Sequence, residues 1–382
     1  MGLPPQQSFF LFGPRGTGKS TWVSQSLPQA LHLDLLRQDL YRELDARPER
    51  IRNLLESHPD VEWVFVDEIQ KIPALLDEIH RIMELQPSRK WALTGSSARK
   101  LRRGAVNLLG GRAIRMEMHP YMACELGDDF ELAKALRQGL VPLVWESDSP
   151  ESTLSTYAGM VLREEVQAEG LVRNLSAYSR FLETLSFSQG SALNLSNVSR
   201  ECGVDRKTLD GYLSVTEDLL LCHRLPVFAK RARRELSSHS KLYIFDAGVF
   251  RSLRPKGPLD SPEEMDGQAL ESLVFQHLRA WRSLRGQGES LHYWRTRSGT
   301  EVDFVVYGET TFVALEVKNT GRIQNADLRS IRTFQQDYPE CRCALLYRGA
   351  ERRMENGIIC VPVEEFLRRL HPRHGLACAL EG

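Results

Sequence analysis

Residues 8–20, Ser-Phe-Phe-Leu-Phe-Gly-Pro-Arg-Gly-Thr-Gly-Lys-Ser, decide the fold of the first third of the chain. The apolar run 8–12 predicts a buried strand, and residues 13–20 match the pattern G-x-x-x-x-G-K-[ST] in full. Glycines let backbone N–H groups curl around phosphate oxygens, and a helix that starts at the end of the loop points its positive end at them. The stretch therefore predicts an ATP site, with Lys19 at the β- and γ-phosphates and Ser20 on Mg²⁺.

An acidic pair ends a later strand pattern. The sequence Trp63-Val-Phe-Val-Asp67-Glu68 lies about 50 residues after the phosphate loop. Because the carboxyl ends of parallel strands meet at one edge of a sheet, Asp67 is expected beside the loop, where it holds Mg²⁺ through its water shell. Glu68 is expected to polarise the attacking water. The pair therefore predicts ATP hydrolysis and not binding alone.

A hydroxyl-rich turn, Thr94-Gly-Ser96-Ser97, follows the strand pattern of residues 91–94. A hydroxyl here, Ser96 in particular, can sense the γ-phosphate or position water. The same serines can cap a following helix, and the two roles are compatible. The arginines that come next are Arg99, Arg102, Arg103 and Arg112. One of them can be an arginine finger for a neighbour's γ-phosphate, and each can also be an ordinary surface arginine.

Strand and helix patterns divide the chain into segments. Strand patterns at residues 8–12, 31–35, 62–66, 91–94 and 113–117 alternate with helical ones such as 75–84. This alternation predicts a parallel, doubly wound α/β sheet. Residues 120–189 have a helical pattern throughout. A long helical pattern at 267–285 precedes most of the later strand patterns, which lie at 242–245, 291–295, 301–307, 311–317 and 343–347. We expect a P-loop domain at 1–120, a helical lid at 121–189, a winged-helix-like region at 190–237 and an α/β domain at 238–382.

Residues 195–213 have the pattern of a helix-turn-helix, with its turn at Gly203 and a second helix beginning near Asp205. Arg206, Lys207 and Tyr212 on that helix can reach phosphates or base edges. The basic run Lys230-Arg231-Ala-Arg233-Arg234 lies where a wing is expected and suits a phosphate track. Winged helices also pack against proteins, and DNA is the partner that we favour.

Two strand patterns and a helix near the C-terminus carry carboxylates and a lysine. Glu316 and Lys318 are two positions apart, so they face the same side of a strand, and Asp303 is thirteen positions earlier, within a hairpin's reach. The long helical pattern contributes Glu271. Carboxylates that converge with one lysine predict a Mg²⁺ site and a cation that can orient or deprotonate water. The alternative is a solvated E-x-K pattern on an amphipathic strand.

The motifs together resemble a bacterial and archaeal family of AAA+ ATPases that carry a C-terminal domain of unknown function related to restriction endonucleases. The likeness rests on the phosphate loop, Val-Asp67-Glu68-Ile-Gln70, Leu-Thr94-Gly-Ser96-Ser97 and Gly111-Arg112. It continues through Tyr157…Arg163-Glu164-Glu165-Val166, Gly203-Val-Asp-Arg-Lys-Thr208…Tyr212-Leu and Lys241-Leu-Tyr-Ile-Phe-Asp246, and so covers essentially the whole chain.

The resemblance implies an AAA+ domain with a helical lid and a winged helix, followed by an α/β restriction-endonuclease-like domain of the PD-(D/E)XK type. Val302 stands where that pattern has proline. Assembly into a homo-oligomer, with a ring as one option, is also implied. In such ATPases Gly111-Arg112 falls near the position of the arginine that acts on a neighbouring subunit's nucleotide. Arg163, in the lid, is a loose match to a second nucleotide-sensing residue. Folds of this type either cut DNA or only grip it, and both options stay open here.

The predictions concern three groups of residues. The predicted nucleotide contacts are Gly13, Pro14, Arg15, Gly16, Thr17, Gly18, Lys19, Ser20, Thr21, Asp67 and Ser96. The predicted Mg²⁺ ligands are Ser20 and Asp67 at the nucleotide, and Glu271, Asp303 and Glu316 near the C-terminus. The predicted catalytic groups are Glu68, Arg112, Asp303, Glu316 and Lys318.

Composition limits the function classes. Lys plus Arg and Asp plus Glu both number 50 in 382 residues, so DNA binding requires a local basic face. Seven cysteines without a C-x-x-C pair indicate reduced thiols in a cytoplasm, and no apolar run is long enough to cross a membrane. The favoured hypothesis is an ATP-driven ATPase that acts on DNA, with a nuclease-like C-terminal domain. The rival is an ATP-dependent signalling or defence switch whose C-terminal domain binds protein and does not cut.

Overall fold

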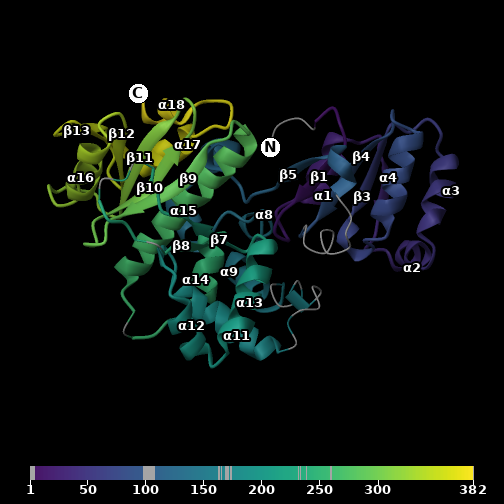
Figure 1. Cartoon of the computed structure of the whole chain (residues 1–382), viewed down its shortest axis with the longest axis horizontal. Coiled ribbons are helices and arrows are strands. Elements are labelled where there is room, and N and C mark those ends of the chain that lie inside the picture. Colours follow the sequence, from purple (N-terminus) through teal and green to yellow (C-terminus); the bar gives the residue numbers. More distant parts are fainter. Residues whose placement is uncertain are drawn as a thin grey trace. The chain divides into compact units, whose positions relative to one another are not determined.

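The computed structural model describes residues 5–97, 108–161, 164, 166–167, 172, 174–230, 232, 234–237, 239–258 and 260–381. The chain divides into two compact units (Figure 1). The N-terminal unit comprises Met1–His119, Glu165–Leu171 and Ser214–Leu221. The C-terminal unit comprises Pro120–Glu164, Val172–Leu213 and Cys222–Gly382.

A five-stranded parallel sheet forms the N-terminal unit. Its strands are β1 (Phe9–Phe12), β2 (Leu31–Asp34), β3 (Trp63–Asp67), β4 (Lys90–Gly95) and β5 (Ile114–Glu117), in the order β2-β3-β4-β1-β5. Its helices are α1 (Lys19–Ser26), α2 (Gln38–Ala46), α3 (Ile51–Glu56) and α4 (Leu75–Leu85), with short 3₁₀ turns at Pro48–Arg50, Ile69–Lys71 and Leu108–Gly111. These strands and α4 confirm the predicted positions to within a residue or two.

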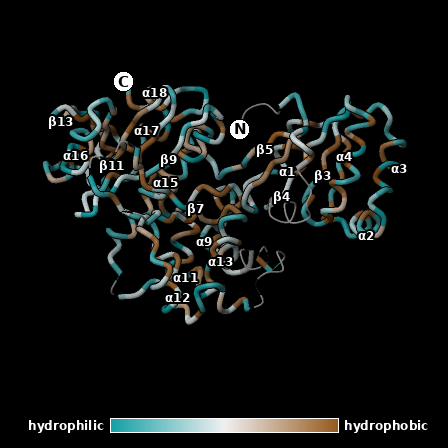
Figure 2. Tube along the Cα trace, viewed as in Figure 1, coloured by the Kyte–Doolittle hydropathy of each residue, from teal (hydrophilic) through white to brown (hydrophobic). Residues whose placement is uncertain are grey.

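The residues of β1 explain why this sheet is covered on both faces. Phe10 and Phe12 pack into a core that includes the buried face of α4, whereas Phe9 and Leu11 pack into a second core with Val23 of α1. Alternate residues point to opposite faces of a strand, so four consecutive apolar residues require two cores. Hydrophobic colour accordingly runs along the strands of this sheet (Figure 2).

A run of short helices opens the C-terminal unit, as the helical pattern predicts. They are α6 (Ala123–Leu126), a 3₁₀ turn (Gly127–Asp129), α7 (Leu132–Gln138), α8 (Pro142–Trp145), α9 (Pro150–Thr156), a π-helical turn (Tyr157–Val161) and α11 (Leu175–Ser186). Asp246 joins this run to α14 (Ala247–Leu253), because its buried carboxylate accepts from the N–H of Leu140 at 2.7 Å and from two N–H groups of α14. A Cβ at Gly139 would lie 1.9 Å from Asp246 Oδ1, which explains the glycine.

Two helices and a small antiparallel sheet follow. The elements are β6 (Ser191–Ala192), α12 (Leu195–Cys202), α13 (Arg206–Asp218), β7 (Cys222–Leu225) and β8 (Lys241–Ile244), with the sheet order β6-β8-β7. Gly203 ends α12 with a φ of 65°, so the turn lies where the sequence predicts it. β8 was expected to begin the C-terminal domain, but it pairs with β6 and β7 instead.

The third part of the chain is a mixed six-stranded sheet. Its strands are β9 (Ser290–Arg295), β10 (Glu301–Tyr307), β11 (Phe312–Lys318), β12 (Arg342–Tyr347), β13 (Arg353–Glu355) and β14 (Ile358–Pro362), in the order β13-β14-β12-β11-β10-β9. Its helices are α15 (Pro262–Arg285), α16 (Arg329–Asp337), α17 (Val363–Arg369) and α18 (Leu376–Leu380). The sequence predicts β9 to β12 but not β13 and β14. None of the helices in the described part of the chain is long and apolar enough to span a membrane.

Residues 226–240 form the segment that we call the β7–β8 connection, and residues 226–228 and 235–237 of it lie along the outer edge of β9. The N–H of Phe228 donates to Tyr293 O at 2.7 Å, and the N–H of Ser237 donates to Arg295 O at 3.0 Å. The Phe228 ring is buried in the core between this sheet and α16. The connection therefore extends the C-terminal sheet by a partly paired edge segment.

A buried histidine on α15 predicts acid sensitivity of the fold. His277 Nε2 accepts from the N–H of Ala123 at 2.9 Å, and Nδ1 lies 2.8 Å from Leu273 O. This pairing requires a neutral ring, and burial lowers the pKa of His277 from 6.5 to about 4. The unfolded chain therefore takes up this proton first as the pH falls through 6.5, so His277 destabilises the fold by about 3 kcal/mol by pH 4.

The measurement compares urea unfolding of wild type and His277→Gln between pH 7 and pH 4. The free-energy difference between the two proteins should shift by about 3 kcal/mol in favour of the variant as the pH falls. A constant difference across this range would mean that His277 does not titrate as described.

Candidate functional site

The phosphate loop follows β1 and leads into α1, as predicted. Gly16 and Gly18 have φ values of 76° and 83°, which glycine adopts without strain. A Cβ at Gly13 would lie 2.6 Å from Met118 O, so only glycine fits where the loop passes β5. Gly18 caps α1 with no side-chain hydrogen bond, so the cap leaves the start of the helix open to an anion.

Lys19 points into this loop. Its ammonium donates to Gly13 O at 2.8 Å and to Pro14 O at 3.1 Å, and the residue is buried. The Thr17 hydroxyl also donates to Pro14 O, at 2.7 Å. Ser20 is half-buried in the first turn of α1, whereas the flanking predicted contacts Arg15 and Thr21 are exposed. The loop therefore holds its lysine within the curve where phosphate oxygens bind in such loops.

Asp67 and Thr94 meet at the carboxyl ends of β3 and β4. The Thr94 hydroxyl donates to Asp67 Oδ1, and both residues are buried. In the sheet order β3-β4-β1, β4 is adjacent to the strand that carries the phosphate loop, and β3 is the next strand beyond it. The sequence singles out Ser96 in the turn after β4, whereas the structure places Thr94 against the predicted Mg²⁺-holding carboxylate.

Glu68 is held in place by a glutamine. Its φ is 60°, a value that is uncommon for a non-glycine residue. The side-chain amide of Gln70 donates to Glu68 Oε2 and, at 3.2 Å, to Ser96 Oγ. The Glu68 N–H also donates to the Thr94 hydroxyl at 3.3 Å. A Cβ at Gly95 would lie 2.4 Å from Gln70 Oε1, so this glycine leaves room for the positioning amide.

Arg112 is bound by α4 of its own unit. Its guanidinium lies 2.6 Å from His80 Nε2 and donates to Glu84 Oε1 at 3.1 Å, while its side chain is 43% exposed. A role as an arginine finger in trans stays a prediction, and it requires Arg112 to leave these partners. The other predicted arginines, Arg99, Arg102, Arg103 and Arg163, lie outside the described residues.

The predicted carboxylate–lysine set converges in the C-terminal unit, but around a second lysine. Phe304 pairs with Leu315 in the β10–β11 hairpin, which brings Asp303 beside Glu316 as predicted. Lys241, from β8, places its ammonium 2.9 Å from Glu271 Oε1 and 3.3 Å from Asp303 Oδ1. Glu301 and Tyr243 complete the group: Glu301 Oε1 lies 2.6 Å from the Lys241 ammonium, and the Tyr243 hydroxyl donates to Glu271. Lys318 instead pairs with Glu316 Oε1 at 2.7 Å.

These side chains do not fit a bound metal as they stand. In the described residues, no group of three or more His, Cys, Asp or Glu side chains could hold a metal ion. The predicted ligands Glu271 and Asp303 contact an ammonium, and Glu316 contacts another. Lys241 gives no local signal of this role, because its partners lie 30, 60 and 62 positions away along the chain.

Burial governs the charges of this cluster. Burial lowers the pKa of the Lys241 ammonium, but Glu271, Tyr243, Asp303 and Glu301 together raise it well above its ordinary value. Burial raises the pKa of Glu271 to about 7, against the opposing effect of Lys241. Burial and the nearby Asp303 raise the pKa of Glu316 well above its ordinary range. The Lys241 ammonium is therefore charged at neutral pH, whereas burial favours the protonated forms of Glu271 and Glu316.

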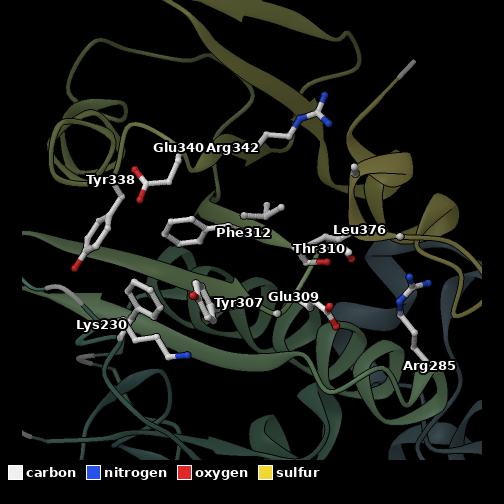
Figure 3. A pocket seen from close by; sticks show the side chains of 16 residues that line it. Lys230, Arg285, Tyr307, Glu309, Thr310, Phe312, Tyr338, Glu340, Arg342 and Leu376 are labelled. Atoms are coloured by element: carbon white, nitrogen blue, oxygen red, sulfur yellow. The ribbon is translucent and has the colours of Figure 1, made fainter.

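Part of the predicted basic track is engaged within the chain. Arg234 donates to the buried Asp337 carboxylate at 2.7 Å, and the Lys230 ammonium lies 4.0 Å from the centre of the Tyr307 ring. Figure 3 shows Lys230 and Tyr307 at one side of a cavity of about 900 Å³, with Arg285 and Arg342 also on its wall. The other two arginines of the run, Arg231 and Arg233, lie outside the described residues.

The second helix of the predicted helix-turn-helix presents two of its three candidate contacts. Arg206 and Lys207 are exposed, and Arg206 contacts Asp210, one turn along the helix, at 3.3 Å and donates to Ser196 Oγ of α12 at 3.4 Å. Tyr212 was expected to reach DNA, but its ring is buried against Tyr178 and Phe181. Its periodic position places it on the inward face of α13, which explains the correction.

Three family models match consecutive segments of the chain. Residues 5–127 match an AAA domain, residues 129–260 a domain of unknown function (DUF8612), and residues 266–366 a second domain of unknown function (DUF4143). The second segment ends after β8, and the third begins within α15. No curated protein matches the chain.

Solved structures give only distant likenesses. The replication initiator DnaA bound to AMPPCP and single-stranded DNA is 13% identical, with a TM-score of 0.29, over 55% of this chain and 82% of that one. Protein VC1899 from Vibrio cholerae is 13% identical over 90% and 96% of the two chains, with a TM-score of 0.23.

A signal transduction ATPase with a tetratricopeptide repeat sensor, from Pyrococcus horikoshii, is 11% identical over 73% of this chain and 45% of that chain, with a TM-score of 0.23. At these TM-scores the likenesses carry no functional argument. The family match and the geometry of the phosphate loop agree with each other over the same residues. The N-terminal third of the chain therefore matches an AAA domain and carries a phosphate loop, and the two segments that follow match domains of unknown function.

Proposed function

We propose that the chain hydrolyses ATP at the phosphate loop and couples hydrolysis to DNA. The observation that carries the hydrolysis step is the arrangement of Glu68, whose carboxylate is held by Gln70 next to the Asp67–Thr94 pair. A base for the attacking water must be positioned within reach of the γ-phosphate, and this network supplies both position and orientation. Lys19 would bind the phosphates, and Ser20 and Asp67 would hold Mg²⁺, which neutralises charge on the phosphates.

The proposed DNA contact is α13. A helix-turn-helix followed by an antiparallel sheet is the arrangement of a winged helix, and its second helix is the one that enters a major groove. Arg206 and Lys207 lie in the exposed first turn of that helix. Because the chain has no net charge, a local pair of this kind must supply the attraction to phosphates.

The double variant Arg206→Ala/Lys207→Ala should bind DNA less tightly. Loss of up to two phosphate contacts should flatten the plot of log K against log salt by up to about 2 units. Fluorescence anisotropy with a labelled duplex across a salt series measures both quantities. Basal ATP turnover should be unchanged, because Lys19, Asp67 and Glu68 are intact.

The matched control is Lys256→Ala/Arg353→Ala, which removes the same charge from exposed positions on other elements. Its salt slope should equal that of wild type. Equal slopes and affinities in all three proteins would exclude α13 as the DNA contact.

A second function has specific support. The ion pair of Arg234 with Asp337 neutralises one cation of the predicted phosphate track, and Lys230 packs on the Tyr307 ring. This favours a nucleotide-dependent switch in which the winged helix and the C-terminal domain pack against protein. DNA stimulation of ATP turnover separates the two proposals, because a protein-binding switch has no reason to respond to DNA.

Assembly into a homo-oligomer is part of the first proposal. Arg112 is 43% exposed and held by two exposed side chains, His80 and Glu84, which a neighbouring subunit's nucleotide can replace as a partner. Light scattering with and without ATP tests whether nucleotide drives assembly. A monomer under both conditions would remove Arg112 from the mechanism.

A further inference from the structure

Lys241 is the most deeply buried charged side chain of the C-terminal carboxylate cluster. Its side chain is 1% exposed, and three carboxylate oxygens from Glu271, Glu301 and Asp303 lie 2.6 to 3.3 Å from its ammonium. These oxygens come from α15 and β10, whereas Lys241 comes from the small sheet of β6, β7 and β8. An ammonium buried without such partners would be costly, so the cluster and the lysine stabilise each other.

A divalent ion would need the same oxygens. Mg²⁺ and Mn²⁺ prefer carboxylate ligands at short range and a site free of competing cations. Both carboxylate oxygens of Asp303 are already engaged, because Oδ1 contacts the Lys241 ammonium and Oδ2 accepts from the N–H of Val317 at 2.9 Å. A metal ion at this cluster would therefore compete with the Lys241 charge for the same carboxylates.

Glu316 indicates that the cluster is built for a cation. Its carboxylate is buried, and Oε1 contacts Lys318, but Oε2 has no hydrogen-bond partner in the described residues. Glu316 interacts electrostatically with both Asp303 and Lys241, so this oxygen belongs to the same group. A buried carboxylate oxygen without a partner is costly, and it is available to a metal ion once the Lys241 ammonium no longer competes.

We propose that the Lys241 ammonium is the resident cation of this cluster and takes the place of the divalent metal that the E-x-K pattern predicts. The C-terminal domain of the wild-type chain then binds no Mg²⁺ or Mn²⁺ at Asp303 and Glu316 and does not cut DNA by a metal-dependent route. Lys241 is the first residue of β8, directly after the β7–β8 connection. The cation of the C-terminal cluster therefore comes from the small sheet of β6, β7 and β8. This inference stands whether or not the chain acts on DNA.

The experiment measures Mn²⁺ binding to the nucleotide-free full-length chain by electron paramagnetic resonance. All proteins carry Asp67→Asn, so that the ATP site does not contribute. The parent protein should bind no Mn²⁺ that depends on Asp303. Lys241→Met should gain an Asp303-dependent Mn²⁺ site that is roughly tenfold or more tighter than any residual Mn²⁺ binding by the parent, because one positive charge has left the carboxylates. Adding Asp303→Asn to Lys241→Met should abolish the gain.

A second readout does not depend on binding stoichiometry. Lys241→Met leaves buried carboxylates without a counter-ion and should melt at a lower temperature than the parent, and Mn²⁺ should restore the melting temperature of the variant only. Lys241→Gln, which keeps polar N–H groups, replaces Lys241→Met if the latter does not fold.

Two results would overturn the proposal. One is that the parent protein, with Lys241 intact, binds Mn²⁺ and loses this binding when Asp303→Asn is added. The other is a folded Lys241→Met or Lys241→Gln that gains neither Mn²⁺ binding nor thermal stabilisation by Mn²⁺. Asp303-dependent binding by the variants alone supports it.

Discussion

Glu68→Gln is expected to bind ATP as tightly as wild type and to turn it over at least about 100-fold more slowly. The amide keeps the size of the side chain but cannot accept a proton from the attacking water. Gln70 holds the Glu68 carboxylate and Ser96 together, so the substitution removes the base while the remaining network around Thr94 and Asp67 persists. Phosphate release and fluorescent-nucleotide binding, measured on one preparation, separate the two effects.

Glu62→Gln is the matched control for this variant. Glu62 precedes β3 at the strand end opposite Glu68, and its side chain is exposed and pairs with Lys90. Its turnover should equal that of wild type. Turnover by Glu68→Gln within a few-fold of wild type would remove Glu68 from the mechanism and leave the Asp67–Thr94 pair to explain hydrolysis.

Lys19→Ala is expected to lose tight ATP binding altogether. The ammonium lies within the loop, 2.8 Å from Gly13 O. Loss of a buried charge from a phosphate contact costs about 3 kcal/mol or more, which corresponds to roughly 100-fold in affinity. Isothermal titration with ATP and Mg²⁺ measures the loss directly.

Lys90→Ala is the matched control for this variant. Lys90 lies at the amino end of β4, at the opposite end of the strands from the phosphate loop, so the variant loses an equal charge and should bind ATP normally. Circular dichroism establishes that both variants fold. ATP affinity in Lys19→Ala within threefold of wild type would mean that this loop does not carry the phosphates.

The sequence predicts much of the N-terminal unit because its signals are local. The pattern of residues 13–20 fixes a strand, a loop and a helix at once, and the run that ends at Asp67 places a carboxylate at the correct sheet edge. The β10–β11 hairpin is predictable for the same reason, since Asp303 and Glu316 are close in sequence. Patterns of period two and spacing within a motif suffice for such elements.

The missed features depend on contacts between distant residues. Nothing near Gln70 indicates that its amide will meet Ser96, 26 positions later. The strand pattern of β8 is the same whether it joins the C-terminal sheet or pairs with β6 and β7, so its partner could not be predicted. Lys241 reads as an ordinary strand residue until the fold surrounds it with carboxylates from α15 and β10. Tyr212 was misplaced for a related reason. A helix-turn-helix match does not specify which face of its second helix is buried, and the Tyr212 ring lies on the buried face.

The rate of ATP turnover by the purified full-length chain, measured with and without duplex DNA and beside Glu68→Gln, tests the central claim most directly. The account predicts Mg²⁺-dependent phosphate release that DNA stimulates and that falls at least about 100-fold in the variant under both conditions. Wild-type turnover no faster than that of Glu68→Gln would contradict hydrolysis at this site. Glu68-dependent turnover that DNA leaves unchanged would contradict the coupling to DNA and favour the protein-binding switch.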